Sequence, residues 1–225
     1  LYKEMNGYSQ KQLYEEASGV KDKIARLEYI TQPITPASSF IENPNLAEDI
    51  FGEESKTLRT LLSKYMSLGK KLERIECFDV AHLAGTQQTA SMVTFIKGEP
   101  DKKLYRQFRI RSSRKADDIA SLKEVAERRF KALASWGSPD LILVDGGKAQ
   151  VSVFNEIFSK VGVPVVGLAK RTETLIIPNP RGVMANFVEI RVKGLALNLL
   201  QRARNEAHRF ARRYHHFLLK KSLIP

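Results

Sequence analysis

The 225-residue sequence predicts an α/β fold in which a mixed five-stranded sheet is flanked by helices and preceded by an N-terminal helical extension. Two observations predict this fold. Three strand-like segments joined by short turns open the central part of the chain, and short connections make such strands antiparallel. Two more strand-like segments follow, each after a helical segment, and helical crossovers make those strands parallel to the first. Other mixed α/β folds share this order and stay open on the pattern alone.

The N-terminal extension begins with an apolar stripe on a charged helix, predicted over residues 9–30. The stripe repeats at alternating steps of four and three residues, through Leu13, Ala17, Val20, Ile24 and Leu27. A narrow stripe of this kind is typical of a helix that packs on a partner helix. The alternative is an ordinary helix packed on its own domain. Residues 31–56 contain three prolines and no period, which predicts a linker. A short amphipathic helix over 57–71 then opens the main domain, expected at 57–225.

The remaining segments alternate between strand-like and helix-like patterns. Strands are predicted at 74–81, 88–97 and 103–110, with a Gly98–Asp101 turn before the third. The later elements are a helix over 117–134, a strand at 140–145, a helix to about 160, a strand at 163–169, a hairpin at 173–178 and 186–191, and a long helix over 196–220.

Composition narrows the class of protein. The 37 basic and 25 acidic residues give a formal charge of +12, which favours a polyanionic partner such as nucleic acid. A basic proteome and an anionic membrane surface are the alternatives. No apolar run is long enough to span a membrane. Because Cys77 is the single cysteine, an internal disulfide and a multi-cysteine zinc site are excluded. The start at Leu1 and the missing signal-peptide pattern indicate a fragment of a longer cytoplasmic protein.

Two carboxylates carry the predicted chemistry. Asp79 sits inside an apolar strand, where an ionised side chain is costly unless it is paired or binds a metal. Asp145 ends a second apolar strand, at the edge where ligands bind in open α/β sheets. If the two strands are neighbours, the two carboxylates share one divalent cation, Mg²⁺ or Mn²⁺. The alternative for Asp145 is a turn residue before Gly146 and Gly147.

A histidine would complete this site as a metal ligand or proton carrier, and the final helix supplies the favoured candidate. His208 shares a helical face with Arg204, Ala207 and Ala211, so it can face the sheet. A core or surface histidine is the alternative. The other candidates are His82, His215 and His216. Seven Lys or Arg residues over 202–221 indicate a surface that contacts a nucleic-acid backbone, with a solvated face as the alternative.

Several stretches of the sequence resemble the UvrC family, the incising subunits of the bacterial excinuclease. They occur in the family's order over 74–220: RIECFDVAH at 74–82, ASMV at 90–93, YRQF at 105–108, DD at 117–118, RRF at 128–130, PDLILVDGGK at 139–148, LAK at 168–170 and EAHRFA at 206–211. The resemblance implies an RNase H-like, metal-dependent endonuclease domain that cuts damaged double-stranded DNA on the 5′ side of the lesion. It places the family's catalytic carboxylates at Asp79 and Asp145, and its catalytic histidine at His208.

The N-terminal segment resembles a second part of the same family. Residues 14–24, YEEASGVKDKI, are similar to half of the UVR motif, which implies that residues 1–30 bind UvrB. Two positions depart from the family pattern: Ala81 stands where serine is usual, and Asn205 where an aspartate is usual. If that aspartate is a ligand, its loss weakens metal binding. The family's GIY-YIG nuclease domain and helix-hairpin-helix motifs do not occur in this sequence. The alternative function is a non-catalytic scaffold of the same fold that binds DNA and UvrB.

Overall fold

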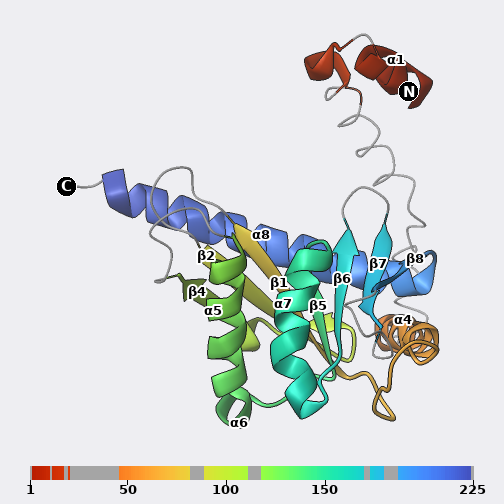
Figure 1. Ribbon diagram of the computed structural model, residues 1–225, viewed down its shortest axis with the longest axis vertical. Coiled ribbons are helices and arrows are strands. Elements are labelled where there is room, and N and C mark those ends of the chain that lie inside the picture. Colours follow the sequence, from red (N-terminus) through yellow and green to blue (C-terminus); the bar gives the residue numbers. More distant parts are fainter. Residues whose placement is uncertain are drawn as a thin grey trace. The chain divides into compact units, whose positions relative to one another are not determined.

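The computed structural model describes residues 2–10, 12–17, 20, 46–81, 89–110, 118–169, 173–179 and 187–223, with the side chains of 214–223 left out (Figure 1). The chain divides into two compact units, Leu1–Leu46 and Ala47–Pro225. Among these residues no helix is long and apolar enough to cross a membrane.

The first unit differs from the predicted continuous helix over 9–30. Helix α1 spans Tyr2–Gln10, and residues 14–17 are helical again. Between them Gln12 has a φ of 59°, a left-handed conformation that an α-helix does not continue through. The prediction was therefore wrong in placing residues 9–13 inside one helix. Residues 21–30, which complete the predicted stripe, lie outside the described residues.

The second unit is built on one mixed sheet. Its strands are β1 (Arg74–Ala81), β2 (Thr89–Ile96), β3 (Glu99–Pro100), β4 (Arg106–Arg109), β5 (Leu141–Val144), β6 (Val165–Ala169), β7 (Thr174–Pro178) and β8 (Phe187–Arg191). They run in the order β3-β2-β1-β5-β6-β7-β8, and β4 also pairs with β2. Strand β1 pairs antiparallel with β2 and parallel with β5, and β6 is parallel to β5. The predicted mixed sheet is confirmed.

The sheet is wider than the five strands that the sequence predicted. Eight strands are paired in the part of the chain that the structure describes. The predicted C-terminal hairpin forms β7 and β8, and it continues the sheet because β7 pairs antiparallel with β6. Its strands are largely apolar on the side of the main core, where Leu175 and Ile177 are fully buried. That burial favours joining the sheet over standing apart from it.

Helices cover both faces of this sheet (Figure 1). On one face lie α5 (Asp118–Lys131), the short α6 (Leu133–Trp136) and α7 (Lys148–Phe158), whose apolar residues form a core with Phe78, Met92 and Val144. On the other face lie α4 (Leu46–Leu62) and α8 (Leu195–Leu223), which pack on Ile75, Cys77 and Leu143. Alternate residues of β1 therefore face opposite cores, as the period of a strand requires.

Helix α4 corrects the predicted boundary between linker and domain. The sequence predicted a linker to residue 56 and a helix over 57–71, whereas α4 begins at Leu46 and ends at Leu62. The acidic residues of α4 interrupt the apolar pattern by which a helix is predicted from sequence. Glu54 is 2% exposed and receives two hydrogen bonds from the Arg202 guanidinium, at 2.6 and 3.1 Å, so it contacts α8 and not solvent. Residues 31–45 are not described, and the predicted division at 1–30, 31–56 and 57–225 otherwise stays a prediction.

Other boundaries moved by a few residues. The third predicted strand, 103–110, is shortened to β4 because residues Lys102–Leu104 form a 3-10 turn capped by the Asp101 side chain. The long final helix is confirmed and extends from Leu195 to Leu223.

Candidate active site

Asp79 and Asp145 lie beside each other near the ends of two neighbouring parallel strands. In the β1–β5 pairing Phe78 lies opposite Val144, and the Asp145 N–H donates to the Phe78 carbonyl at 2.9 Å. One step further along both strands are Asp79 and Asp145. Neighbouring strands lie about 4.8 Å apart. Two acidic residues distant in the chain therefore lie side by side at the carboxyl ends of neighbouring strands.

Asp79 faces α8, and both acids are withdrawn from water. Ile75 and Cys77 belong to the core on that face, and Asp79 follows Cys77 by one strand period. Asp79 is 5% exposed, and both side-chain oxygens of Asp145 are buried. A pair of acids withdrawn from water in this way needs a compensating charge or hydrogen bonds.

His208 supplies one such contact from α8. Its Nδ1 lies 3.2 Å from Oδ2 of Asp79, while 53% of its side chain is exposed. Small buried residues let α8 approach the sheet closely at this point, namely Ala203, Ala207 and Ala211. The three predicted site residues therefore come from the ends of β1 and β5 and from α8, and His208 joins Asp79 directly.

The buried thiol of Cys77 is affected by both acids. Burial raises the pKa of Cys77 well above its ordinary value, and the negative charges of Asp145 and Asp79 raise it further. The positive charge of Arg204 acts in the opposite direction. Arg204 lies one helical turn before His208 on α8 and so belongs to the same electrostatic environment.

The donors suit a hard divalent cation, which prefers carboxylate oxygens and retains several water ligands. No group of three or more His, Cys, Asp or Glu side chains is arranged to hold a metal ion among the residues with described side chains. Asp79 and Asp145 would therefore be the protein ligands of such an ion, and water or phosphate oxygens would fill its remaining coordination positions. His82 lies outside the described residues, as do the side chains of His215 and His216. Asn205 is exposed on α8.

Two polar clusters beside the site were not found from the sequence. Arg204 is held by Glu173 through contacts of 3.1 to 3.3 Å, and Glu206 accepts a hydrogen bond from the Tyr105 hydroxyl at 2.9 Å. Glu173 lies just before β7 and Tyr105 just before β4, so each pair joins segments far apart in the chain. Neither pair has a local sequence pattern that would have predicted it.

The sequence Gly146-Gly147-Lys148 after Asp145 suits a tight turn, and equally a helix start whose amides and ammonium bind phosphate. The Gly147 N–H donates to Oε1 of Gln150 at 2.9 Å, and Lys148 forms an ion pair with Glu189 at 2.7 Å. The Gly147 amide and the Lys148 ammonium, which a phosphate would need, therefore already have partners within the protein. Packing constrains the same turn, because a Cβ on Gly167 would overlap Val151 and lie 2.9 Å from the Gly146 carbonyl oxygen.

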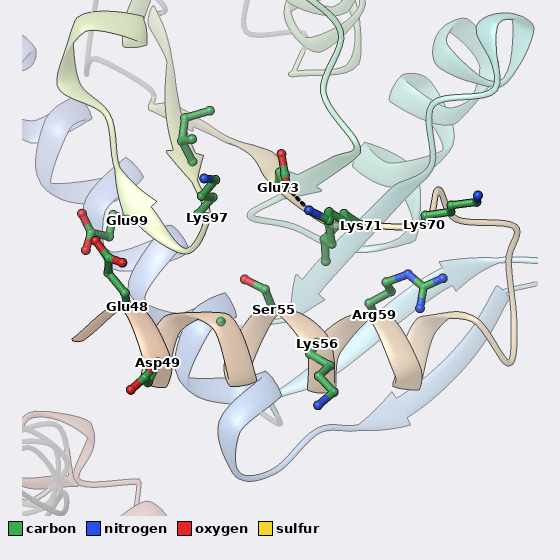
Figure 2. Close-up of a pocket in the computed structure, with 13 residues that line it drawn as sticks. Glu48, Asp49, Ser55, Lys56, Arg59, Lys70, Lys71, Glu73, Lys97 and Glu99 are labelled. Atoms are coloured by element: carbon green, nitrogen blue, oxygen red, sulfur yellow. Dashed lines mark ion pairs between the residues drawn. The ribbon is translucent and has the colours of Figure 1, made fainter. Parts of the chain in front are cut away.

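A pocket of about 670 Å³ lies elsewhere in this unit, between α4, the segment that enters β1 and the β2–β3 turn (Figure 2). Its lining mixes acidic and basic side chains, and Lys71 pairs with Glu73 inside it at 3.4 Å. The pocket contains none of the three predicted site residues. It lies at the start of β1, whereas Asp79 lies near the end of that strand.

Comparison with known proteins identifies the family. Residues 63–211 match the model of the UvrC RNase H endonuclease domain. UvrABC system protein C of Chlorobaculum tepidum is 44% identical over 68% of this chain and 25% of that protein, and the Methanosarcina barkeri protein of the same name is 43% identical over 80% and 34%. The chain thus spans about a quarter to a third of the length of these relatives. A crystal structure of Ciona intestinalis endonuclease V with inosine-containing DNA covers 76% of the chain, and 98% of its own, at 11% identity and a TM-score of 0.45. With a family model matching well over half of its length, the chain belongs to the UvrC RNase H endonuclease domain family.

Proposed function

We propose that this chain is a divalent-metal-dependent DNA endonuclease that makes the incision 5′ to a lesion in nucleotide excision repair, within the UvrABC system. The observation that carries the proposal is the meeting of Asp79 and Asp145 at matched register, with His208 Nδ1 at 3.2 Å from Asp79. Membership of an endonuclease family supports it. The substrate is damaged double-stranded DNA.

Each site residue then has a defined task. Asp79 and Asp145 would hold Mg²⁺ or Mn²⁺, which when bound activates water and neutralises charge on the phosphate. His208 keeps Nδ1 on Asp79, which leaves Nε2 to ligate the ion or to carry a proton. Burial of the carboxylates keeps bulk water away from their oxygens.

The DNA backbone is expected along the basic part of α8. Arg209, Arg212 and Arg213 are exposed, on the same helix as His208. The formal charge of +12 supports attraction of a polyanion. Binding through phosphates weakens steeply with salt, so a salt titration of DNA affinity is a direct measure of these contacts.

The partner UvrB is assigned to the N-terminal segment. Residues 14–24 resemble half of a UVR motif, and a short helix docking on a similar helix needs the apolar stripe that begins at Leu13. Deleting residues 1–30 should abolish UvrB binding in a pull-down and leave the thermal unfolding of the second unit unchanged. Retained UvrB binding would place the contact elsewhere.

The activity is tested by incubating the chain with the other UvrABC proteins, a duplex carrying one defined lesion, and Mg²⁺ or Mn²⁺. The wild-type chain should nick the damaged strand 5′ to the lesion. Asp79→Asn and Asp145→Asn should bind the duplex and fail to nick it. Glu53→Gln removes an acid of similar charge on the exposed side of α4 and should nick normally, which makes it the matched control.

The alternative scaffold function predicts a different result. If Asp79→Asn and Asp145→Asn bind DNA and support incision at the wild-type rate, cutting occurs elsewhere and the nuclease proposal is wrong. A loss of nicking in all variants, Glu53→Gln included, would show that acidity in general and not the paired carboxylates matters.

A further inference from the structure

Close to His208, small side chains form the surface by which α8 rests on the sheet. At this point the helix contacts the sheet through alanines at 203, 207 and 211, all buried. Alanines make few shape-specific contacts, so polar bonds contribute to holding the register here, in addition to the buried Leu199 and Leu200 and the ion pairs of Arg202 and Arg204 nearer the start of α8. A shift of one residue along a helix moves a side chain by about 1.5 Å and turns it by roughly 100°. His208 would then no longer face Asp79.

Ser91 provides one polar contact that fixes this register. Its hydroxyl donates to the backbone carbonyl of Ala207 at 3.1 Å, inside the core. In the β1–β2 pairing Ser91 is the residue opposite Asp79. The strand position beside Asp79 is thus tied to the helix position immediately before His208. Ser91 is 1% exposed, so water cannot readily replace this bond.

Tyr105 provides a second contact, at the residue of α8 before Ala207. Its hydroxyl donates to Oε1 of Glu206 at 2.9 Å, and its ring meets the Phe210 ring edge-on at 5.0 Å between centroids. Arg209 holds the same carboxylate through two hydrogen bonds of 2.6 and 2.7 Å. These contacts, from Glu206 to Phe210, therefore lie within about one helical turn of His208.

We propose that Ser91 and Tyr105 are positioning residues, which lock α8 in the one register that brings His208 to Asp79. The proposal deepens the proposed function, since the locked pair is the one assigned to metal binding and proton transfer. The hydroxyls of Ser91 and Tyr105 bond to Ala207 and Glu206 of α8, so both act through the helix. Reacting groups displaced by about 1 Å lose up to about 100-fold in rate, which makes a register lock of this kind consequential.

Two variants test the lock, each removing a hydroxyl and little else. Ser91→Ala loses the bond to the Ala207 carbonyl, and Tyr105→Phe loses the bond to Glu206 while keeping its ring against Phe210. The matched control is Thr94→Val, on the same strand. Thr94 is fully buried, faces the opposite side of the sheet from Ser91, and donates to the Leu104 carbonyl at 3.3 Å. The Thr94→Val variant therefore loses a comparable hydrogen bond that does not involve α8.

Two measurements are made on the chain. The first is the split between kcat and KM for lesion-containing DNA, in the assay with the other UvrABC proteins: Ser91→Ala and Tyr105→Phe should each lower kcat about tenfold or more with KM unchanged. The second is the ¹⁵N spectrum of the His208 ring, assigned with His208→Gln. In both variants, but not in Thr94→Val, the Nδ1 signal should move away from its hydrogen-bonded position.

The outcomes separate this proposal from the nuclease proposal. An unchanged Nδ1 signal in Ser91→Ala and Tyr105→Phe would overturn the register lock, whatever the activity. Equal losses of kcat in these variants and in Thr94→Val would overturn it too, since general destabilisation would then explain them. If the wild-type chain does not nick DNA, the nuclease proposal fails, and the ring spectrum still decides whether Ser91 and Tyr105 position His208.

Discussion

Replacing Asp79 with asparagine removes one of the two neighbouring carboxylates and keeps the size of the side chain. Two unit negative charges about 4.8 Å apart repel by about 3.5 kcal/mol at an effective dielectric constant of 20. His208 Nδ1 lies 3.2 Å from the Asp79 carboxylate, on one side of this pair. A shared divalent cation reverses the repulsion. The consequence of Asp79→Asn is therefore expected in the response of stability to metal, more than in stability itself.

The size of that response follows from linkage. An ion at 100 times its dissociation constant stabilises the folded chain by about 2.7 kcal/mol. If Asp79→Asn weakens the site about a hundredfold, the same concentration gives about 0.4 kcal/mol. The assay is urea unfolding with Mn²⁺ and with chelator, for wild type, Asp79→Asn and the surface control Glu53→Gln. Wild type and Glu53→Gln should gain equally and Asp79→Asn hardly at all. An equal gain in all three would refute a site held by Asp79.

Three further predictions concern residues around the site. Gly167→Ala should lower the free energy of unfolding by about 1–3 kcal/mol, measured in urea, because the new Cβ overlaps Val151 and presses on the Gly146 carbonyl. Cys77 should react with iodoacetamide only as fast as the chain unfolds, monitored by mass spectrometry, because burial raises its pKa and keeps the thiol protonated. Hydrogen bonds from Arg209, opposed by burial and aided by Tyr105, hold the pKa of Glu206 below its ordinary 4.5. Its stabilisation is therefore present above that pH and lost as pH falls through the lower value, so wild type and Glu206→Gln should differ by up to about 1 kcal/mol at pH 7 and converge in acid unfolding curves.

The main parts of the fold were predictable because they depend on local patterns. Strand β1, for example, matches its predicted range of 74–81, since alternating burial is visible in the sequence. The start of α4, residues 46–56, was harder to predict and was assigned to the linker. Helix α4 was partly read as linker because Glu54 looks solvent-facing until Arg202, far away in the chain, is seen to pair with it.

In the candidate site, too, local features were predictable and long-range contacts were not. The chemistry of Asp79 and Asp145 was predictable from an acid within or at the end of an apolar strand. Their matched register was not, because it depends on the pairing of β1 with β5 across 60 residues or more of chain. Nor was the bond between Ser91 and Ala207, since a serine in a strand has many alternative partners and only the packing of α8 selects one.

Anomalous scattering from crystals of the chain soaked in Mn²⁺ would show whether Asp79 and Asp145 share one cation. We expect an anomalous peak within bonding distance of a carboxylate oxygen from each residue, lost in crystals of Asp145→Asn. A well-occupied manganese peak elsewhere in the molecule, with none between these two side chains, would contradict it.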